Sequence, residues 1–120
     1  MKTYEEQIDG GTTANLRELL RSGLIRTFET TCELCCKSMK RWLEMNFNPT
    51  MVSGVNRREF FRICAENTLI DDVDQWMEFY QARNRTSYIY SDAVAEEALA
   101  AALIFLPYAQ DSLKRLEELS

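Results

Sequence analysis

The chain has 120 residues, of which 46% are hydrophobic and 28% charged, and its formal net charge is −5. This composition is typical of a globular domain with one core, so we expect a single domain over residues 1–120. No apolar run approaches the roughly 20 residues that cross a membrane, and no apolar signal segment follows Lys2. We therefore expect a cytoplasmic protein with no membrane partner, and the acidic balance argues against general coating of nucleic acid.

The first part of the chain is expected to be mainly one long helix. Residues 1–14 contain two adjacent glycines, so this segment is expected either to be disordered or to form a shortened first helix. Asn15 followed by Glu18 has the pattern of an N-cap with its capping-box partner, and Ser22-Gly23 is expected to bend or split the helix that follows. Its apolar face recurs at three- and four-residue spacing and consists of Leu16, Leu20, Leu24, Phe28, Cys32, Cys35, Met39 and Trp42.

Three cysteines lie on one face of this predicted helix, in the segment "CELCC". We interpret Cys32, Cys35 and Cys36 as small core residues in a reducing compartment. Zinc binding is the alternative, because C-x-x-C is a ligand spacing. Since the sequence has no histidine and no second C-x-x-C, we expect no metal.

Three further helices are predicted after a loop that contains Pro49 and Gly54. Asn56 with Glu59 repeats the capping-box signature. Asp71 or Asp72 is expected to cap the third helix, and the acids of "DDVD" to complement its dipole instead of binding a divalent cation. Ser91 or Asp92 is expected to cap the last helix, which Pro107 should kink. The expected fold is all-α, an antiparallel up-and-down four-helix bundle.

Basic residues are concentrated in the first half of the chain and acidic residues in the second half. Arg57, Arg58 and Arg62 form a basic face on the predicted second helix. This face either pairs with acidic helices inside the bundle or meets phosphate groups.

An aromatic stripe with one arginine is the most informative pattern in the sequence. Trp76, Tyr80, Arg83, Ser87 and Tyr90 follow one another at helical spacing. An arginine among aromatic residues needs a carboxylate or an anion. One interpretation is an intramolecular pair of Arg83 with Glu29 or Glu33. The other is a polar notch in which the guanidinium binds phosphate and the phenols bind or stack on a base.

Two segments of the sequence resemble a known family. They are "FETTCELCCK" and "LIDDVDQWMEFYQARNRTSYIYSDAVAEE", and the resemblance covers roughly residues 24–118. The second segment is similar to a family pattern in which tryptophan is followed by Arg-Asn-x-Thr-Ser-His-x-Tyr. On these residues the chain resembles the nucleotidyltransferase substrate-binding proteins, which are helical members of the HEPN superfamily.

The resemblance implies a helical bundle that forms a homodimer and pairs with a separately encoded minimal nucleotidyltransferase. The partner enzyme would supply the metal and triphosphate chemistry, so no cofactor is expected in this chain. In related HEPN toxins, an arginine and a histidine form a metal-independent ribonuclease site across the dimer. A nearby tyrosine there is nucleotidylated by the paired enzyme, which silences the toxin.

Carried over by position, Arg83 is the family arginine, Asn84 the polar residue after it, and Tyr90 the nucleotidylated tyrosine. Tyr88 stands where the family has histidine. A phenol with a pKa of about 10 is poorly matched to proton transfer near neutral pH, so the catalytic motif of Arg83 and Tyr88 is degenerate. The candidate site for substrate or phosphate comprises Arg83, Asn84, Ser87 and Tyr90, with Glu29, Glu33, Lys37 and Trp76 in supporting positions.

Three hypotheses follow from these residues. The first is a non-catalytic subunit that helps a nucleotidyltransferase bind its substrate, with a nucleotide or RNA as ligand, in a toxin–antitoxin module. The second is a ribonuclease toxin with Tyr88 in the histidine position, and the third is a structural helical interaction protein. Because the shortened first helix is expected to leave part of the apolar face of the long helix uncovered, a dimer or an obligate partner is expected.

Overall fold

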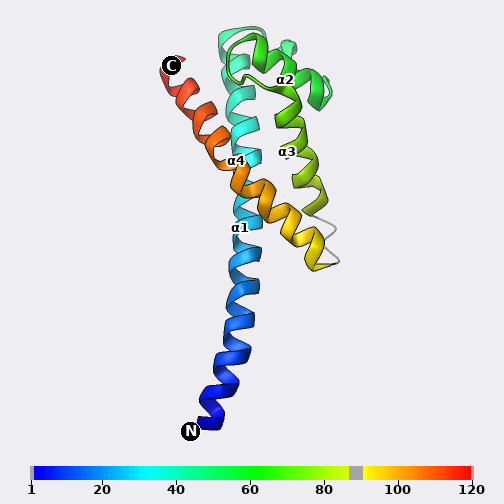
Figure 1. The fold of residues 1–120 in the computed structure, drawn as a ribbon. Helices are drawn as coiled ribbons and strands as arrows, with labels where there is room; N and C mark the ends of the chain where they lie inside the picture. Colours follow the sequence, from blue (N-terminus) through cyan, green and yellow to red (C-terminus); the bar gives the residue numbers. More distant parts are fainter. Residues whose placement is uncertain (1, 87–90, 120) are drawn as a thin grey trace.

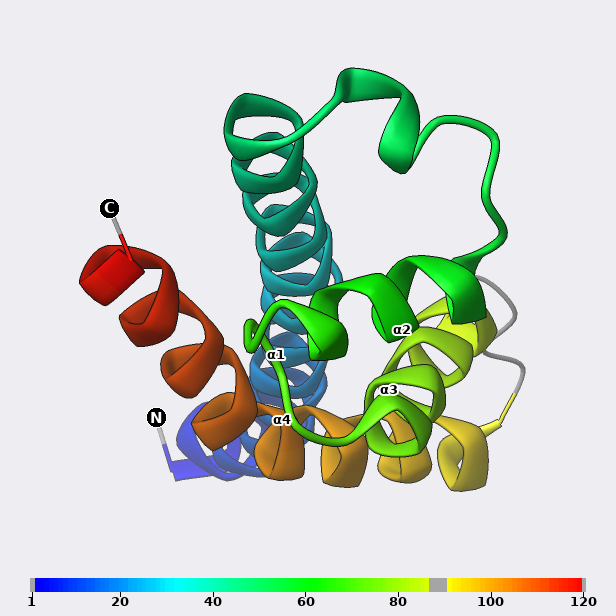
Figure 2. The same ribbon diagram turned by 90° about the horizontal axis from the view of Figure 1, so that it is seen from above.

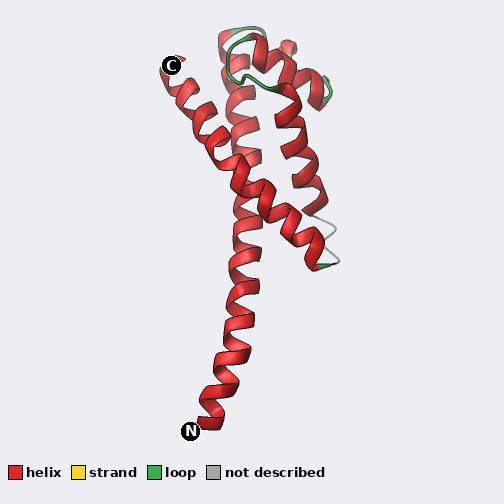
Figure 3. Ribbon diagram, in the orientation of Figure 1, coloured by secondary structure: helices red, strands yellow, loops and turns green. Residues whose placement is uncertain are grey.

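The computed structural model describes residues 2–86 and 91–119, with side chains described for Thr13 and from Asn15 onward. Within these ranges the chain forms four α-helices and a short 3-10 helix and contains no strand (Figure 3). In chain order the elements are α1 (Lys2–Asn46), η1 (Pro49–Met51), α2 (Arg57–Glu66), α3 (Val73–Arg85) and α4 (Asp92–Leu119). The predicted all-α fold is confirmed.

The first helix is longer than the sequence pattern predicted. α1 runs unbroken for 45 residues, and at 1.5 Å per residue its length is about 68 Å. This length accounts for the longest dimension of the molecule, 66 Å. The N-cap predicted at Asn15 is wrong, because residues 2–14 continue the same helix, and the helix is not split at Ser22-Gly23. A glycine costs only about 1 kcal/mol inside a helix, which the helix-forming residues around it can offset.

The helices form the predicted up-and-down arrangement. α1 leads to the short α2 at one end of the molecule, α3 runs back antiparallel to α1, and α4 returns across both (Figure 1). Pro107 lies inside α4, and Figure 2 shows this helix changing direction between its two ends. Since proline removes one backbone hydrogen bond and clashes with the preceding turn, the predicted kink is explained by its chemistry.

The core is built around aromatic rings from three helices. The ring centroid of Phe105 lies 5.4 Å from Phe28, 5.4 Å from Trp76 and 4.9 Å from Phe79. These edge-to-face contacts add specific geometry to the apolar burial. Phe105 therefore joins α4 to both α1 and α3.

The cysteines pack in this core, as predicted. Cys32, Cys35 and Cys64 are buried and Cys36 is half-buried, and all four thiols are free. Burial raises the pKa of Cys36 to about 11 and that of Cys64 to about 12. These thiols are thus protonated at neutral pH and are poor nucleophiles or metal ligands. Among the described residues, no three histidine, cysteine or acidic side chains are grouped as a metal site would require.

Side-chain caps fix the starts of the three later helices. Asn56 Oδ1 accepts a hydrogen bond from the Glu59 amide at 2.8 Å, and Asp72 Oδ1 accepts one from the Gln75 amide at 3.0 Å. Ser91 Oγ accepts one from the Val94 amide at 3.4 Å. Three of the predicted caps are therefore confirmed, with Asp72 and Ser91 as the capping members of their pairs.

The N-terminal part of α1 projects beyond the other helices (Figure 1). On this projecting part Leu16, Leu19, Leu20 and Leu24 are between 45% and 67% exposed. From Ile25 onward, the same helix buries Phe28, Cys35 and Met39 against the core. None of the described helices combines the length and hydropathy needed to cross a membrane.

Candidate functional site

A cavity of about 310 Å³ lies where α1, α2 and α3 meet, and it contains Arg83. We call it the basic notch. Its lining residues are Cys32, Glu33, Cys36, Lys37, Arg57, Tyr80 and Arg83. The notch therefore combines three cationic side chains with one carboxylate, one phenol and two protonated thiols.

Arg83 is held at the edge of the notch by an acidic partner and by its neighbour in sequence. Its guanidinium forms an ion pair with Glu33, and it donates a hydrogen bond to Asn84 Oδ1 at 3.3 Å. The side chain of Arg83 is 31% exposed, so the pair with Glu33 is partly solvated and contributes less than about 1 kcal/mol to stability. Of the two partners predicted from sequence, Glu33 is the one that pairs. An anion that enters the notch can compete with Glu33 for the guanidinium.

Arg57 and Lys37 supply further positive charge. The guanidinium carbon of Arg57 lies 4.8 Å from the centroid of the Tyr80 ring and 5.3 Å from that of Phe60, which are cation–π distances. Within the described ranges of the chain, neither Arg57 nor Lys37 forms an ion pair. The notch consequently has an excess of positive charge, and such a concave surface attracts anions.

A second cavity adjoins the notch across Arg57 and Tyr80, which line both. It has a volume of about 350 Å³ and is lined by Lys40, Val52, Gly54, Val55, Arg57, Phe60 and Tyr80. Lys40 lies one turn after Lys37 on α1. The two cavities together offer a basic surface with one aromatic ring near its centre.

The structure brings together only some of the predicted site residues. Arg83, Glu33 and Lys37 line the notch, and Asn84 is exposed beside Arg83. Glu29 lies elsewhere, in a cavity of about 330 Å³ that it shares with Arg21, Arg26 and Thr86. Trp76 is buried in the aromatic core and does not line the notch. Ser87, Tyr88 and Tyr90 lie outside the described residues.

The predicted basic face on α2 is divided between two roles. Arg58 pairs with Asp74 of α3 at 2.9 Å, as the interpretation of pairing between helices proposed, whereas Arg62 pairs with Glu59 of its own helix at 2.7 Å. Of the three arginines, only Arg57 lines the notch, where it lies against Tyr80 of α3. Sequence reasoning did not connect Arg57 with Arg83, because their proximity depends on how α2 packs on α3.

Comparison with known proteins places this architecture in a family. The family model described as nucleotidyltransferase substrate binding protein like matches residues 1–118. The chain belongs to this family. The resemblance inferred from sequence is therefore confirmed.

Two matches to this nucleotidyltransferase substrate-binding family member, one among curated proteins and one among solved structures, come from Haemophilus influenzae. The chain is 28% identical over 104 residues to a probable ribonuclease HepT, a match that covers 86% of this chain and 71% of the relative. It also matches the solved structure of HI0074, described as the fold of a substrate binding domain of a nucleotidyltransferase. That match has a TM-score of 0.81 and 26% identity and covers 97% of this chain and 90% of HI0074. These relatives support both the bundle and its HEPN relationship.

Proposed function

We propose that this chain is a non-catalytic HEPN-like subunit that pairs with a separately encoded minimal nucleotidyltransferase and helps to bind its substrate. The observation that carries the proposal is the basic notch. Arg83, Lys37 and Arg57 surround a cavity of about 310 Å³ and face a single carboxylate, Glu33. Guanidinium groups bind phosphate through paired, charge-assisted hydrogen bonds, so the notch suits a nucleotide or a short stretch of RNA.

The roles of the notch residues follow from their positions. Arg83 and Asn84 would contact phosphate or backbone, and Tyr80, already stacked on Arg57, would offer its free face to a base. Ser87 and Tyr90 follow Arg83 in sequence and complete the proposed site. Tyr90 is the proposed acceptor of a nucleotidyl group from the paired enzyme.

The projecting part of α1 supports the proposal of a homodimer. A helix that stands alone in water is only marginally stable, and exposed leucines at helical spacing add an apolar face. Leu16, Leu20 and Leu24 on α1 line a cavity of about 380 Å³ together with Leu99 on α4. A second copy of the chain would cover this face by an isologous contact.

A ribonuclease is the second candidate function, and the relative named probable ribonuclease HepT is the observation that favours it. RNA cleavage through the 2′-hydroxyl requires a proton-transfer group with a pKa near neutrality. The chain contains no histidine, and Tyr88 occupies the position of the family histidine. In the notch, the remaining nucleophiles are the thiols of Cys32 and Cys36, and burial raises the pKa of both, that of Cys36 to about 11. This chemistry is better suited to binding than to cleavage.

Co-expression with a minimal nucleotidyltransferase, sought in the reading frame next to that of this chain, tests the proposal. We expect the two chains to co-purify in a ratio that Arg83→Gln leaves unchanged, and substrate affinity to fall in that variant. Intact mass after incubation with ATP would show a nucleotide-sized gain that Tyr90→Phe abolishes. If the complex forms but gains no mass, the chain is a binding subunit and Tyr90 is not a nucleotidyl acceptor. Failure to form any complex would refute the pairing and leave a structural interaction protein.

Growth of cells that express the chain alone separates the binding subunit from the ribonuclease. We expect no growth arrest for the natural chain. If Tyr88→His alone arrests growth, the chain is a silenced nuclease scaffold. Growth arrest by the natural chain, lost in Arg83→Gln, would establish the ribonuclease function and refute the non-catalytic one.

A further inference from the structure

The cavity of about 350 Å³ that adjoins the basic notch has positive charge of its own. We call it the adjoining cavity. Its lining contains Lys40 and Arg57 but no aspartate or glutamate. Lys40 forms no ion pair with a described residue. In the notch an anion has to compete with Glu33 for Arg83, whereas in the adjoining cavity it meets no internal acid.

Arg57 differs from the other arginines of α2. Arg58 and Arg62 each have a carboxylate partner. The guanidinium of Arg57 instead lies over the Tyr80 ring and contacts the Cys36 thiol. A ring and a thiol hold the guanidinium in place without neutralising its charge. Because Arg57 lines both cavities, this charge lies at the boundary between them.

The two cavities follow one another along one face of α1. Glu33, Lys37 and Lys40 lie at positions i, i+4 and i+7 of the helix. Arg83 pairs with Glu33, so the levels of Arg83 and Lys40 differ by about 10 Å along the helix, at 1.5 Å per residue. A ligand with one anionic group at each end of this surface must keep the two groups well apart.

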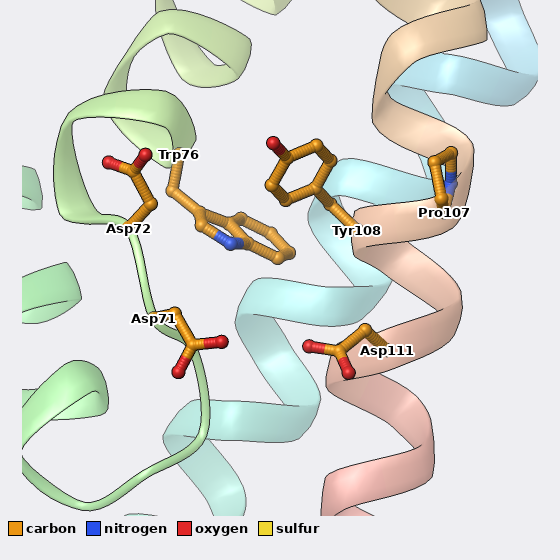
Figure 4. A pocket seen from close by; sticks show the side chains of 6 residues that line it. All are labelled: Asp71, Asp72, Trp76, Pro107, Tyr108 and Asp111. Carbon is orange, nitrogen blue, oxygen red and sulfur yellow. The ribbon is translucent and has the colours of Figure 1, made fainter.

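Another cavity of the molecule has the opposite charge. It has a volume of about 220 Å³ and lies between the loop before α3 and α4 (Figure 4). Its lining consists of Asp71, Asp72, Trp76, Pro107, Tyr108 and Asp111. Arg115 already pairs with Asp71 and Asp111. Phosphate groups are therefore repelled here and attracted to the notch and the adjoining cavity.

We propose that the notch and the adjoining cavity together bind a nucleoside that has one phosphate group at its 3′ oxygen and another at its 5′ oxygen. One phosphate lies between Arg83 and Lys37. The other lies between Lys40 and Arg57, and the nucleoside lies against Tyr80 at the boundary. This inference rests on the proposed function of the notch and adds Lys40 as the residue that selects the ligand.

The position of Tyr80 between the two groups of cations decides against a nucleoside diphosphate or triphosphate. In those molecules the phosphates form one chain on the 5′ side, so the ribose and base do not lie between them. The 3′ and 5′ oxygens lie on opposite sides of the ribose. A free nucleoside bisphosphate and an internal nucleotide of a single strand share this arrangement.

Isothermal titration calorimetry of the full chain tests the proposal with adenosine 3′,5′-bisphosphate as the probe. ADP has the same number of phosphate groups, both on the 5′ side, and ATP controls for total charge. We expect the bisphosphate to bind about tenfold more tightly than either, because it makes a second set of charge-assisted contacts. Lys40→Gln should abolish this difference and leave the affinity for ADP unchanged.

The trinucleotide ApApA distinguishes the two sources of this chemistry. Its middle nucleoside has phosphate on both sides, each as a diester. If ApApA competes with the bisphosphate and Lys40→Gln weakens that competition, the ligand is an internal nucleotide of a single strand. If the bisphosphate binds as expected and ApApA does not compete, the ligand is a free nucleoside bisphosphate.

Arg41→Gln is the matched control. Arg41 follows Lys40 in the sequence and has the same charge, but it lines neither cavity, so all affinities should stay unchanged. The inference is overturned if the bisphosphate binds no better than ADP, or if Arg41→Gln removes its advantage as Lys40→Gln does. In those cases the proposed function of the notch still stands if Arg83→Gln lowers the affinity for ADP. If none of the nucleotides binds, both proposals fail.

Discussion

The two parts of α1 have the same apolar periodicity but different surroundings. From Ile25 to Leu43 the apolar face is covered by α3 and α4 and forms one wall of the core. Before Ile25 the face continues through Leu24, Leu20 and Leu16, which remain exposed. Periodicity therefore specifies where a helix has an apolar face, whereas the length of the partner helices decides how much of that face the monomer covers.

The difference has a functional consequence. The covered part carries Glu33 and Lys37 into the basic notch, so the notch is fixed by the core of a single chain. The projecting part has no such support within the monomer and is the proposed dimer surface. Substitutions that act on one part and not on the other can separate folding from assembly.

The largest effect on folding is expected for Phe105→Ala. Phe105 is buried and contacts three aromatic rings, including Phe28 on the covered part of α1. Its removal should lower the free energy of unfolding by about 3–5 kcal/mol. Urea unfolding followed by circular dichroism measures this change. Phe47→Ala, which removes a half-exposed ring at the end of α1, should cost much less, and equal costs would contradict the assigned core.

The next largest effect is expected for Leu20→Glu on the projecting part. A charge in the proposed dimer surface should weaken self-association at least tenfold, because each copy would bury an unpaired carboxylate. Sedimentation velocity measures the dissociation constant. Leu34→Glu is the control, since Leu34 is also about half exposed but lies on the covered part of α1. The proposed dimer surface would be refuted if the natural chain were monomeric at high concentration. It would also be refuted if Leu20→Glu left the dimer intact while Leu34→Glu weakened it.

A smaller effect is expected in the basic notch. Glu33→Gln frees Arg83 from its internal partner and should raise the affinity for ADP several-fold, whereas Arg83→Gln should lower it about tenfold. Isothermal titration calorimetry at low and moderate salt measures both changes. Arg62→Gln, an exposed arginine paired with Glu59 outside the notch, should have no effect. If Glu33→Gln weakens binding instead, the Glu33–Arg83 pair serves only to hold α1 to α3.

How much the sequence could predict depends on the range of each interaction. The cap at Asn56 was predicted, and those at Asp72 and Ser91 each as one of two adjacent candidates, because a cap needs only its next few residues. The same reasoning failed at Asn15, since a polar residue followed by glutamate is also tolerated inside a helix. The local sequence even favoured a cap at Asn15, because the glycines and threonines of residues 10–13 have low helix propensity.

The candidate site shows the same limit. Spacing placed Arg83 beside the long helix closely enough to predict Glu29 or Glu33 as its partner, and Glu33 is the one that pairs. Spacing also placed Trp76 in the same stripe, but the stripe extends over more than two helical turns. Trp76 is buried in the core and lies beside the cavity that Asp71 and Asp111 line, not beside the notch. The position of Arg57 in the notch depends on the angle between α2 and α3, which periodicity does not contain. The Pro107 kink was predicted, but the cavity of about 220 Å³ beside it was not. Its lining comes from residues 71–76 and 107–111, which are far apart in the sequence.

The smallest effect is expected for a substitution of Arg21, which lies at the boundary between the two parts of α1. Arg21 pairs with Asp92 at 3.0 Å and with Glu96 at 3.3 Å, so it fastens the start of α4 to α1 where the covered part begins. These hydrogen bonds raise the pKa of Arg21 above its usual value, and the side chain therefore stays charged at any ordinary pH. Because the partners are exposed, Arg21→Gln should lower the urea midpoint only slightly, and less in high salt, where the screening length falls to about 3 Å.

Arg17→Gln provides the comparison, one turn earlier on the projecting part. Arg17 has no ion pair with a described residue, so its removal should leave the midpoint unchanged. Both variants are best measured with Leu20→Glu also present, so that self-association does not contribute. If Arg21→Gln lowers the urea midpoint in low salt and not in high salt, the folded core of the monomer ends at this arginine. If Arg17→Gln were equally destabilising, α4 would support α1 farther toward its N-terminus, and the projecting part would be shorter than the exposed leucines indicate.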